Sequence, residues 1–148
     1  MRGFLTQDTS YNYDAWRAFD GNTSFAAGFA PWIAEASEDR WLTLDCGQCY
    51  ILASYKISAS VGGVWEGPVN WTIEASNDNS SWAILDTRSN ETGWYARNDR
   101  YFSSPATVAY RYFRLHIPGS GSYADIAELY LYGTAESTRN QPVIFVVM

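Results

Sequence analysis

The chain of 148 residues is poor in the side chains that catalysis uses most often, with one histidine and two cysteines. His116 alternates onto the polar side of an expected strand, where a lone histidine is typical of a solvated or packing residue. No serine or cysteine stands in a recognisable nucleophile elbow, and no pair of carboxylates has a suggestive setting. The sequence therefore offers no recognisable catalytic motif.

The two cysteines, Cys46 and Cys49, form a Cys-Gly-Gln-Cys segment. Two thiolates cannot complete a zinc site, and the sequence holds no second pair and no histidine cluster. A redox motif of this spacing needs a strand followed by a helix, whereas strand-like sequence lies on both sides here. We interpret them as packing or bridging cysteines beside a turn, with both redox states left open.

Positive charge and long apolar runs are also scarce. Ten Lys and Arg stand against sixteen Asp and Glu, which gives a net charge of −6, so phosphate backbones and anionic lipids are repelled. No apolar run approaches the roughly 20 residues that a spanning helix needs, and residues 143–148 are too few. These features disfavour nucleic acid as a partner and insertion into membranes. Residues 1–5 lead into polar sequence without a signal-peptide pattern, so we expect a module of a longer protein or export by another route.

Aromatic residues are abundant, at 17% with seven Trp and eleven Tyr. A core of this size cannot hold all of them, so some are expected on the surface. Exposed aromatic side chains in a domain of this kind are typical of a binding face.

Hydrophobic residues recur with a period of two, the pattern of half-buried strands. Leu42, Leu44 and Cys46 alternate with Thr43 and Asp45. The same alternation runs through segments 55–61, 69–76, 112–117 and 128–132. Turn-forming sequence separates these segments, and at most residues 14–19 form a turn or two of helix. We predict an all-β domain, a single antiparallel β-sandwich or jelly roll over residues 1–133, with 134–148 as a linker or C-terminal extension.

Five blocks of sequence, taken in order, carry a family resemblance. They are A-F-D-G-N-T-S-F at 18–25, R-W-L-T-L-D-C-G at 40–47, N-W-T-I-E-A-S-N-D-N-S-S-W at 70–82, Y-R-Y-F-R-L at 110–115 and I-A-E-L-Y-L-Y-G at 126–133. The chain resembles the discoidin-like domain (coagulation factor 5/8 type C), and within it the family 32 carbohydrate-binding modules. Cys46 stands where the family has leucine, and Asn79 stands where it has glycine. The resemblance implies a jelly roll with binding loops at one end.

The resemblance also implies a structural cation, usually calcium, between the early Asp-Gly-Asn loop and the late Ala-Glu segment. By position its ligands are the side chains of Asp20, Asn22, Ser24 and Glu128 and the carbonyls of Arg17 and Ala127; Thr23 is the alternative to Ser24. This oxygen set suits calcium. Asp-Gly-Asn alone is equally typical of a plain turn, but Glu128 lies in an apolar run, where a carboxylate needs a partner.

The resemblance places sugar recognition on variable loops, where an aromatic ring stacks on a pyranose and polar groups bridge its hydroxyls. We expect Tyr123 or Trp65 as the platform and Arg97 and Asn98 as the hydroxyl partners, with Trp94 as a further ligand-binding residue. The alternative for each aromatic side chain is packing of a loop against the sandwich.

The predicted function is non-catalytic binding of cell-surface or polysaccharide glycans, with galactose-type or N-acetylated sugars as partners, in an extracellular or particle-surface protein. Weak single sites favour a multidomain or multivalent setting. The alternatives are a membrane- or protein-binding adhesion module and a structural module of a surface or tail-fibre protein. Membrane-docking loops usually carry clustered basic residues, and here these are scattered.

Overall fold

A computed structural model of the chain describes residues 5–7, 15–22, 31–34, 38–59, 67–94, 99–104, 106–119 and 124–136. In chain order the elements are β1 (Leu5–Gln7), the 3-10 helix η1 (Ala15–Phe19), β2 (Trp32–Ala34), β3 (Arg40–Ser58), β4 (Trp71–Ser76), β5 (Ala83–Arg88), β6 (Asp99–Ser103), β7 (Tyr110–Ile117), β8 (Ala124–Ile126) and β9 (Glu128–Ala135). All strand pairs are antiparallel. The predicted all-β class is confirmed, and the short helix lies where it was expected.

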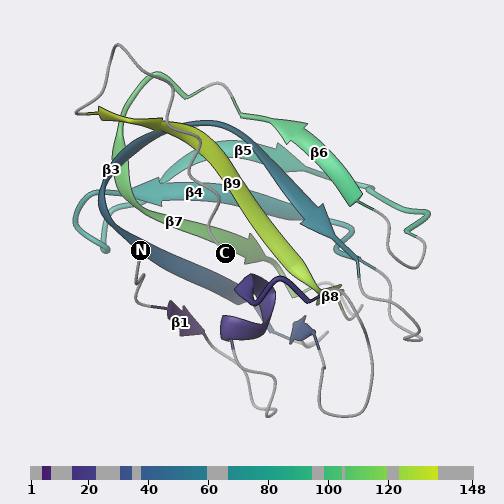
Figure 1. The fold of residues 1–148 in the computed structure, drawn as a ribbon. Coiled ribbons are helices and arrows are strands. Elements are labelled where there is room, and N and C mark those ends of the chain that lie inside the picture. The colour runs from purple at the N-terminus through teal and green to yellow at the C-terminus, as the bar shows by residue number, and fades with distance from the viewer. Residues whose placement is uncertain are drawn as a thin grey trace.

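The long strand β3 joins the two layers of the sandwich (Figure 1). Its first half pairs with β1 and β7, and β4 and β5 continue that layer. Its second half pairs with β6 and β9. The register shifts between Asp45 and Tyr50, where Gly47 has a φ of +75°. The two alternating segments that the sequence showed, 41–46 and 55–61, therefore belong to one bent strand, which ends at Ser58. The strand can bend without breaking because Gly47 adopts a left-handed backbone conformation.

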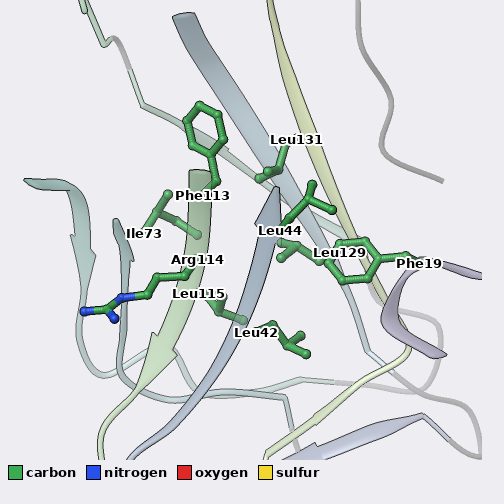
Figure 2. Close-up of a pocket in the computed structure, with 9 residues that line it drawn as sticks. All are labelled: Phe19, Leu42, Leu44, Ile73, Phe113, Arg114, Leu115, Leu129 and Leu131. Atoms are coloured by element: carbon green, nitrogen blue, oxygen red, sulfur yellow. The ribbon is translucent and has the colours of Figure 1, made fainter. Parts of the chain in front are cut away.

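The core lies between these layers. Figure 2 shows apolar side chains of β3, β4, β7 and β9 facing one another, with Phe19 of η1 at their margin. The gap that they line is too small to hold water, so it is not a ligand site. Farther along, the rings of Trp71 on β4 and Phe102 on β6 meet edge to face at 5.1 Å between centroids. The period-two prediction is confirmed, since the predicted inward residues in described strands are buried.

The end of the sandwich at which β3 bends is called the bend end; it holds the turn between β4 and β5. The Asp78 carboxylate accepts hydrogen bonds from the Ser76 hydroxyl and from the backbone N–H groups of Ser80 and Ser81. Asn79 has a φ of +56°. Asparagine tolerates this left-handed backbone better than most residues, which explains why it can stand where the resemblance predicted glycine.

The cysteines of the bend end are not bridged to each other. Cys46 is buried, and Cys49 is half-buried. Burial, reinforced by the charge of Asp45, raises the pKa of the Cys46 thiol to about 12, so this thiol stays protonated near neutral pH. Packing is the role that the structure shows for Cys46.

The last strand continues beyond the alternating pattern seen in the sequence. Thr134 and Ala135 still pair with Ile51 and Tyr50 of β3, and residues 137–148 lie outside the described part of the chain. Within that part, no helix has the length and apolarity to cross a bilayer.

Candidate functional site

The end of the sandwich opposite the bend is called the loop end (Figure 1). Here Ser58, the last residue of β3, pairs with Asp99 at the start of β6 and with Glu128 at the start of β9. The backbone N–H of Ala127 also donates to the Ser58 carbonyl. Three strand termini are thereby fixed side by side.

Four segments of the sequence, which adjoin described residues near the loop end, carry most of the predicted sugar-binding residues. Segments 23–30, 60–66, 95–98 and 120–123 adjoin Asn22, Ala59, Asp99 and Ala124 respectively. Ser24, Trp65, Arg97, Asn98 and Tyr123 themselves lie outside the described residues. One described flank of each segment therefore lies within four residues of Ser58, Asp99 or Glu128 or, in the case of Asn22, is hydrogen-bonded to Glu128.

Three of the predicted cation ligands, Asp20, Asn22 and Glu128, lie in contact with one another. Glu128 is fully buried, and its Oε1 accepts a hydrogen bond of 2.7 Å from the backbone N–H of Asn22. The same N–H lies 2.8 Å from Oδ1 of Asp20. Residues 106 positions apart in the sequence are thus joined in one cluster.

The electrostatics of this cluster are unfavourable to the bare carboxylate. Burial, together with a hydrogen bond to the Asp20 carboxyl, raises the pKa of Glu128 to about 8. Its second oxygen, Oε2, is buried and has no hydrogen-bond partner. A buried oxygen without a partner is costly. The residues present therefore fit a hard cation, although the described chain contains no group of three or more Asp, Glu, His or Cys arranged to hold one.

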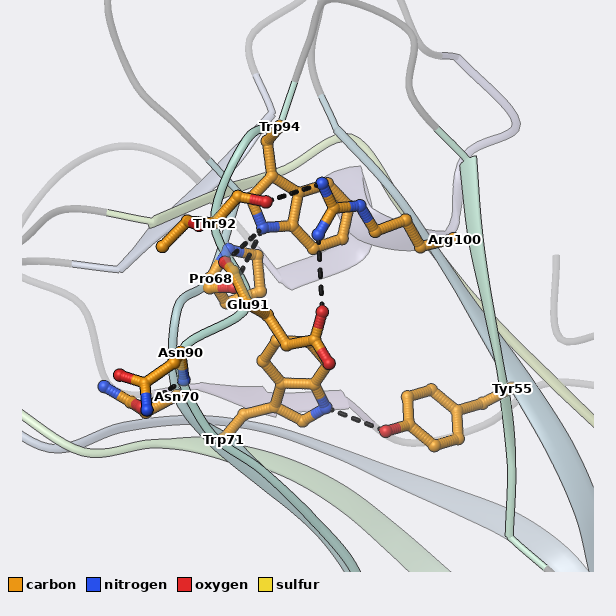
Figure 3. A network of polar contacts seen from close by, with 9 residues as sticks. All are labelled: Tyr55, Pro68, Asn70, Trp71, Asn90, Glu91, Thr92, Trp94 and Arg100. Carbon is orange, nitrogen blue, oxygen red and sulfur yellow. Dashed lines mark hydrogen bonds and ion pairs between the residues drawn. The ribbon is translucent and has the colours of Figure 1, made fainter.

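Trp94 differs from the expectation that it lies exposed (Figure 3). It is 6% exposed, and its indole N–H donates to the carbonyls of Pro68 and Glu91, each at 3.0 Å. The Arg100 guanidinium lies 4.1 Å from the ring centroid, and Trp71 packs nearby at 6.3 Å. The structure shows the packing alternative for Trp94, because a large apolar ring with two carbonyls in reach gains more from burial than from solvent.

Trp94 instead joins two parts of the loop end. A Cβ on Gly67 would lie 2.3 Å from the Trp94 ring, so only glycine permits this contact. Gly67 directly follows segment 60–66, and Trp94 directly precedes segment 95–98. The last boundary of the first segment therefore lies beside the first boundary of the second. Arg100 supports the arrangement by donating to the Thr92 carbonyl at 2.8 Å and pairing with Glu91 at 3.4 Å. The sequence signal that pointed to this anchor was the Gly67-Pro68 pair, which sequence reasoning passed over.

Asp99 is a second feature that sequence reasoning missed. Its carboxylate accepts hydrogen bonds from the Ser58 hydroxyl at 2.6 Å and from the Lys56 ammonium at 3.1 Å. The Lys56 ammonium also lies 3.9 Å from the centroid of the Tyr130 ring. These contacts fix the residue at which segment 95–98 returns to the sheet.

His116 lies on the outer face of the β7–β4 pair, as its alternation predicted. Its Nε2 is 3.3 Å from Asp39, and its Nδ1 is 3.4 Å from Glu74. Both ring nitrogens therefore face carboxylates, and no serine or cysteine of the described chain is hydrogen-bonded to this ring. The geometry is that of an ion-pair network.

Fold and site together define the class: an antiparallel jelly roll with Asp20, Asn22 and Glu128 clustered at one end. The F5/8 type C domain family model matches residues 5–129. The chain belongs to this family, and the resemblance seen in the sequence is confirmed. No curated protein matches it significantly.

Solved structures show the same fold. A fucolectin from the serum of Morone saxatilis (striped bass) has a TM-score of 0.73 at 22% identity, covering 90% of this chain and 47% of the fucolectin; the chain thus spans about half that lectin's length. The Clostridium perfringens module CpGH89CBM32-5, solved with GalNAc-β-1,3-galactose, has a TM-score of 0.67 at 16% identity, covering 88% and 93%. A Streptococcus pneumoniae fucose-binding module has a TM-score of 0.67 at 21% identity, covering 86% and 88%.

Proposed function

We propose that this domain is a non-catalytic glycan-binding module that acts outside the cell or on a particle surface. The observation that carries the proposal is at the loop end, where one flank of each of four sequence segments lies at or near the joined termini of β3, β6 and β9. The likeness to a fucolectin and to a fucose-binding module supports the ligand class. Trp65 and Tyr123 remain the proposed platforms, with Arg97 and Asn98 as hydroxyl partners, while Trp94 anchors the loop end.

We further propose that calcium binds between the Asp20–Asn22 loop and Glu128. The chain offers two carboxylates, the Asn22 side chain and the carbonyls of Arg17 and Ala127, and Ser24 is the remaining candidate. The support is the buried Oε2 of Glu128, which lacks a partner. A divalent cation would satisfy that oxygen and would offset the contact between two carboxyl groups. Its role is structural: it would tie the early loop to the start of β9.

The test is a glycan array probed with multivalently displayed protein, in calcium and again in chelator. Selective binding to galactose-, fucose- or N-acetylated-sugar-terminated glycans is the expected result. Trp65→Ala and Tyr123→Ala are then tested on the glycans found, with Tyr101→Ala as the matched control, since Tyr101 is 67% exposed on β6, outside these segments. We expect at least one of the first two to weaken binding about tenfold, and the control to bind normally.

Two outcomes would contradict the proposal. If the folded, calcium-loaded protein binds no glycan, a protein-binding or structural role takes its place. If it sediments with liposomes that carry no glycan, the membrane-binding alternative is favoured instead.

A further inference from the structure

A groove of about 360 Å³ lies on the outer face of the layer formed by β7, β4 and β5. His116, Thr72 and Thr87 form one row across these three strands. The groove lies beyond the core, because Ile73 and Ala75, which alternate with Thr72 and Glu74, point into the sandwich. Its volume is near the lower limit for small-molecule sites and suits one or two sugar rings.

The charged groups of the groove are already paired. Glu74 accepts a hydrogen bond of 2.7 Å from the Thr72 hydroxyl, binds the Arg114 guanidinium and faces His116. Its pKa is lowered overall: burial raises it, but the hydrogen bonds from Thr72 and Arg114 outweigh that effect. Arg88 donates to Asp86 at 2.8 Å, and its guanidinium lies 4.9 Å from the Phe102 ring. A charged ligand would have to compete with these pairs, so the groove does not favour one.

Neutral hydrogen-bonding groups of the groove are open. Within the described chain, the hydroxyls of Thr87 and Ser89 have no protein partner. Asn70 uses its Oδ1 to accept from the Asn90 backbone N–H at 3.1 Å (Figure 3), which leaves its amide NH₂ available. These groups supply both donors and acceptors at the edge of the groove.

An apolar surface stands beside these polar groups. Ile84 is 64% exposed on β5, and Pro118 lines the opposite side of the groove. A pyranose presents the same combination, with hydroxyls around its rim and C–H groups on its faces. A lipid or an apolar ligand would leave the hydroxyls and the amide of the groove unpaired.

We propose that this groove is a second sugar subsite, which binds one neutral pyranose unit through Asn70, Thr87 and Ser89, with Ile84 farther along the groove, where a second unit would lie. The inference shares its ligand class with the proposed function but rests on different residues. Two sites on one domain raise avidity for a glycan that reaches both.

The test is an NMR titration of the isotopically labelled protein with galactose, N-acetylgalactosamine and fucose as separate probes. We expect saturable shifts at the backbone amides of Thr72, Thr87 and Ser89 with at least one probe. The double variant Thr87→Val/Ser89→Ala removes the two open hydroxyls and keeps a β-branched residue in the strand. Its affinity at these amides should fall about tenfold.

The matched control is Thr134→Val, a strand threonine of β9 in the other layer. It should leave the groove affinity unchanged. Equal weakening in the control and the double variant would overturn the proposal, as would the absence of groove shifts with all three probes. Shifts confined to Ser58, Asp99 and Glu128 would reject the groove and still support glycan binding at the loop end. Shifts confined to the groove would support the groove subsite and would contradict glycan binding at the loop end.

Discussion

Two carboxylates of the bend end, those of Asp45 and Asp78, differ from the Glu128 carboxylate of the loop end in the donors that the protein offers them. At the bend end, Asp45 receives two hydrogen bonds of 2.7 Å from Arg111, and Asp78 is surrounded by donors. The pKa of each is lowered, that of Asp45 chiefly by the Arg111 hydrogen bonds and that of Asp78 chiefly by the Ser81 and Ser80 amides. At the loop end, Glu128 is buried beside Asp20 and its pKa is raised.

This difference separates carboxylates that the protein itself satisfies from one that it does not. Acids of the bend end are charged at neutral pH with their donors supplied by the protein, so they close the turns. The buried acid of the loop end has an oxygen that the protein does not satisfy. The protein's own donors therefore complete the turns of the bend end, whereas the calcium that we propose would complete the Glu128 cluster.

The largest expected effect concerns the anchor of the loop end. Trp94→Ala should lower the free energy of unfolding by about 3–5 kcal/mol, because it removes a buried Trp ring and its hydrogen bonds. Urea unfolding followed by fluorescence measures this. The control variant Tyr101→Ala changes an exposed ring and should lower the free energy of unfolding by much less than Trp94→Ala does. A Trp94→Ala variant as stable as the wild type would show that the indole is not an anchor.

The binding of calcium is expected to have the next largest effect on the free energy of unfolding. At a concentration 100 times its Kd it should stabilise the wild type by about 2.7 kcal/mol, which raises Tm by roughly 5–10 °C for a chain of this size. Glu128→Gln should abolish the shift and, in chelator, should be at least as stable as the wild type, because it removes a buried carboxyl. Differential scanning calorimetry measures the Tm of the wild type and of Glu128→Gln, each in calcium and in chelator. Glu136→Gln, at an exposed glutamate, is the control. An undiminished shift in Glu128→Gln would place any cation elsewhere.

A smaller effect is expected at the bend end when the pH is lowered. The folded-state pKa of Asp45 lies below its ordinary 3.8, so its contribution is present above that value and is lost as the pH falls through the folded-state pKa. Asp45→Asn should cost about 1 kcal/mol near neutral pH, and the difference from the wild type should vanish in acid. Urea unfolding at several pH values measures it. A constant difference would mean that Asp45 acts through packing and not through its charge.

The smallest effect concerns the turn between β4 and β5. Asn79→Ala should destabilise the protein by about 1 kcal/mol, because alanine disfavours the left-handed backbone. Asn79→Gly should stay within about 0.5 kcal/mol of the wild type, since relief at φ is offset by the entropy of the unfolded chain. Thermal unfolding of the two variants side by side gives the comparison. Equal stability of both would show that the turn relaxes away from a positive φ.

Much of the fold could be predicted from the sequence because strand alternation is local information. The inward residues of β3, β4, β7 and β9 follow from a period of two, and the turn at Asn77–Ser80 follows from its composition. The bend in β3 could not be predicted, because the pattern at 41–46 and at 55–61 is the same for two strands or for one. Only the pairing of each half with a different layer distinguishes these cases.

The sequence by itself determined the all-β class, the family and the cluster of Asp20, Asn22 and Glu128, since motif order encodes these. Tertiary structure alone decided that Trp94 is buried while Ile84 is exposed, and that Thr87, Ser89 and Asn70 border one groove. The physical reason is that burial and adjacency depend on which strands pair and which residue lies opposite. Gly67 shows this dependence: it is an ordinary turn residue in the sequence, and in the fold it makes room for the Trp94 ring.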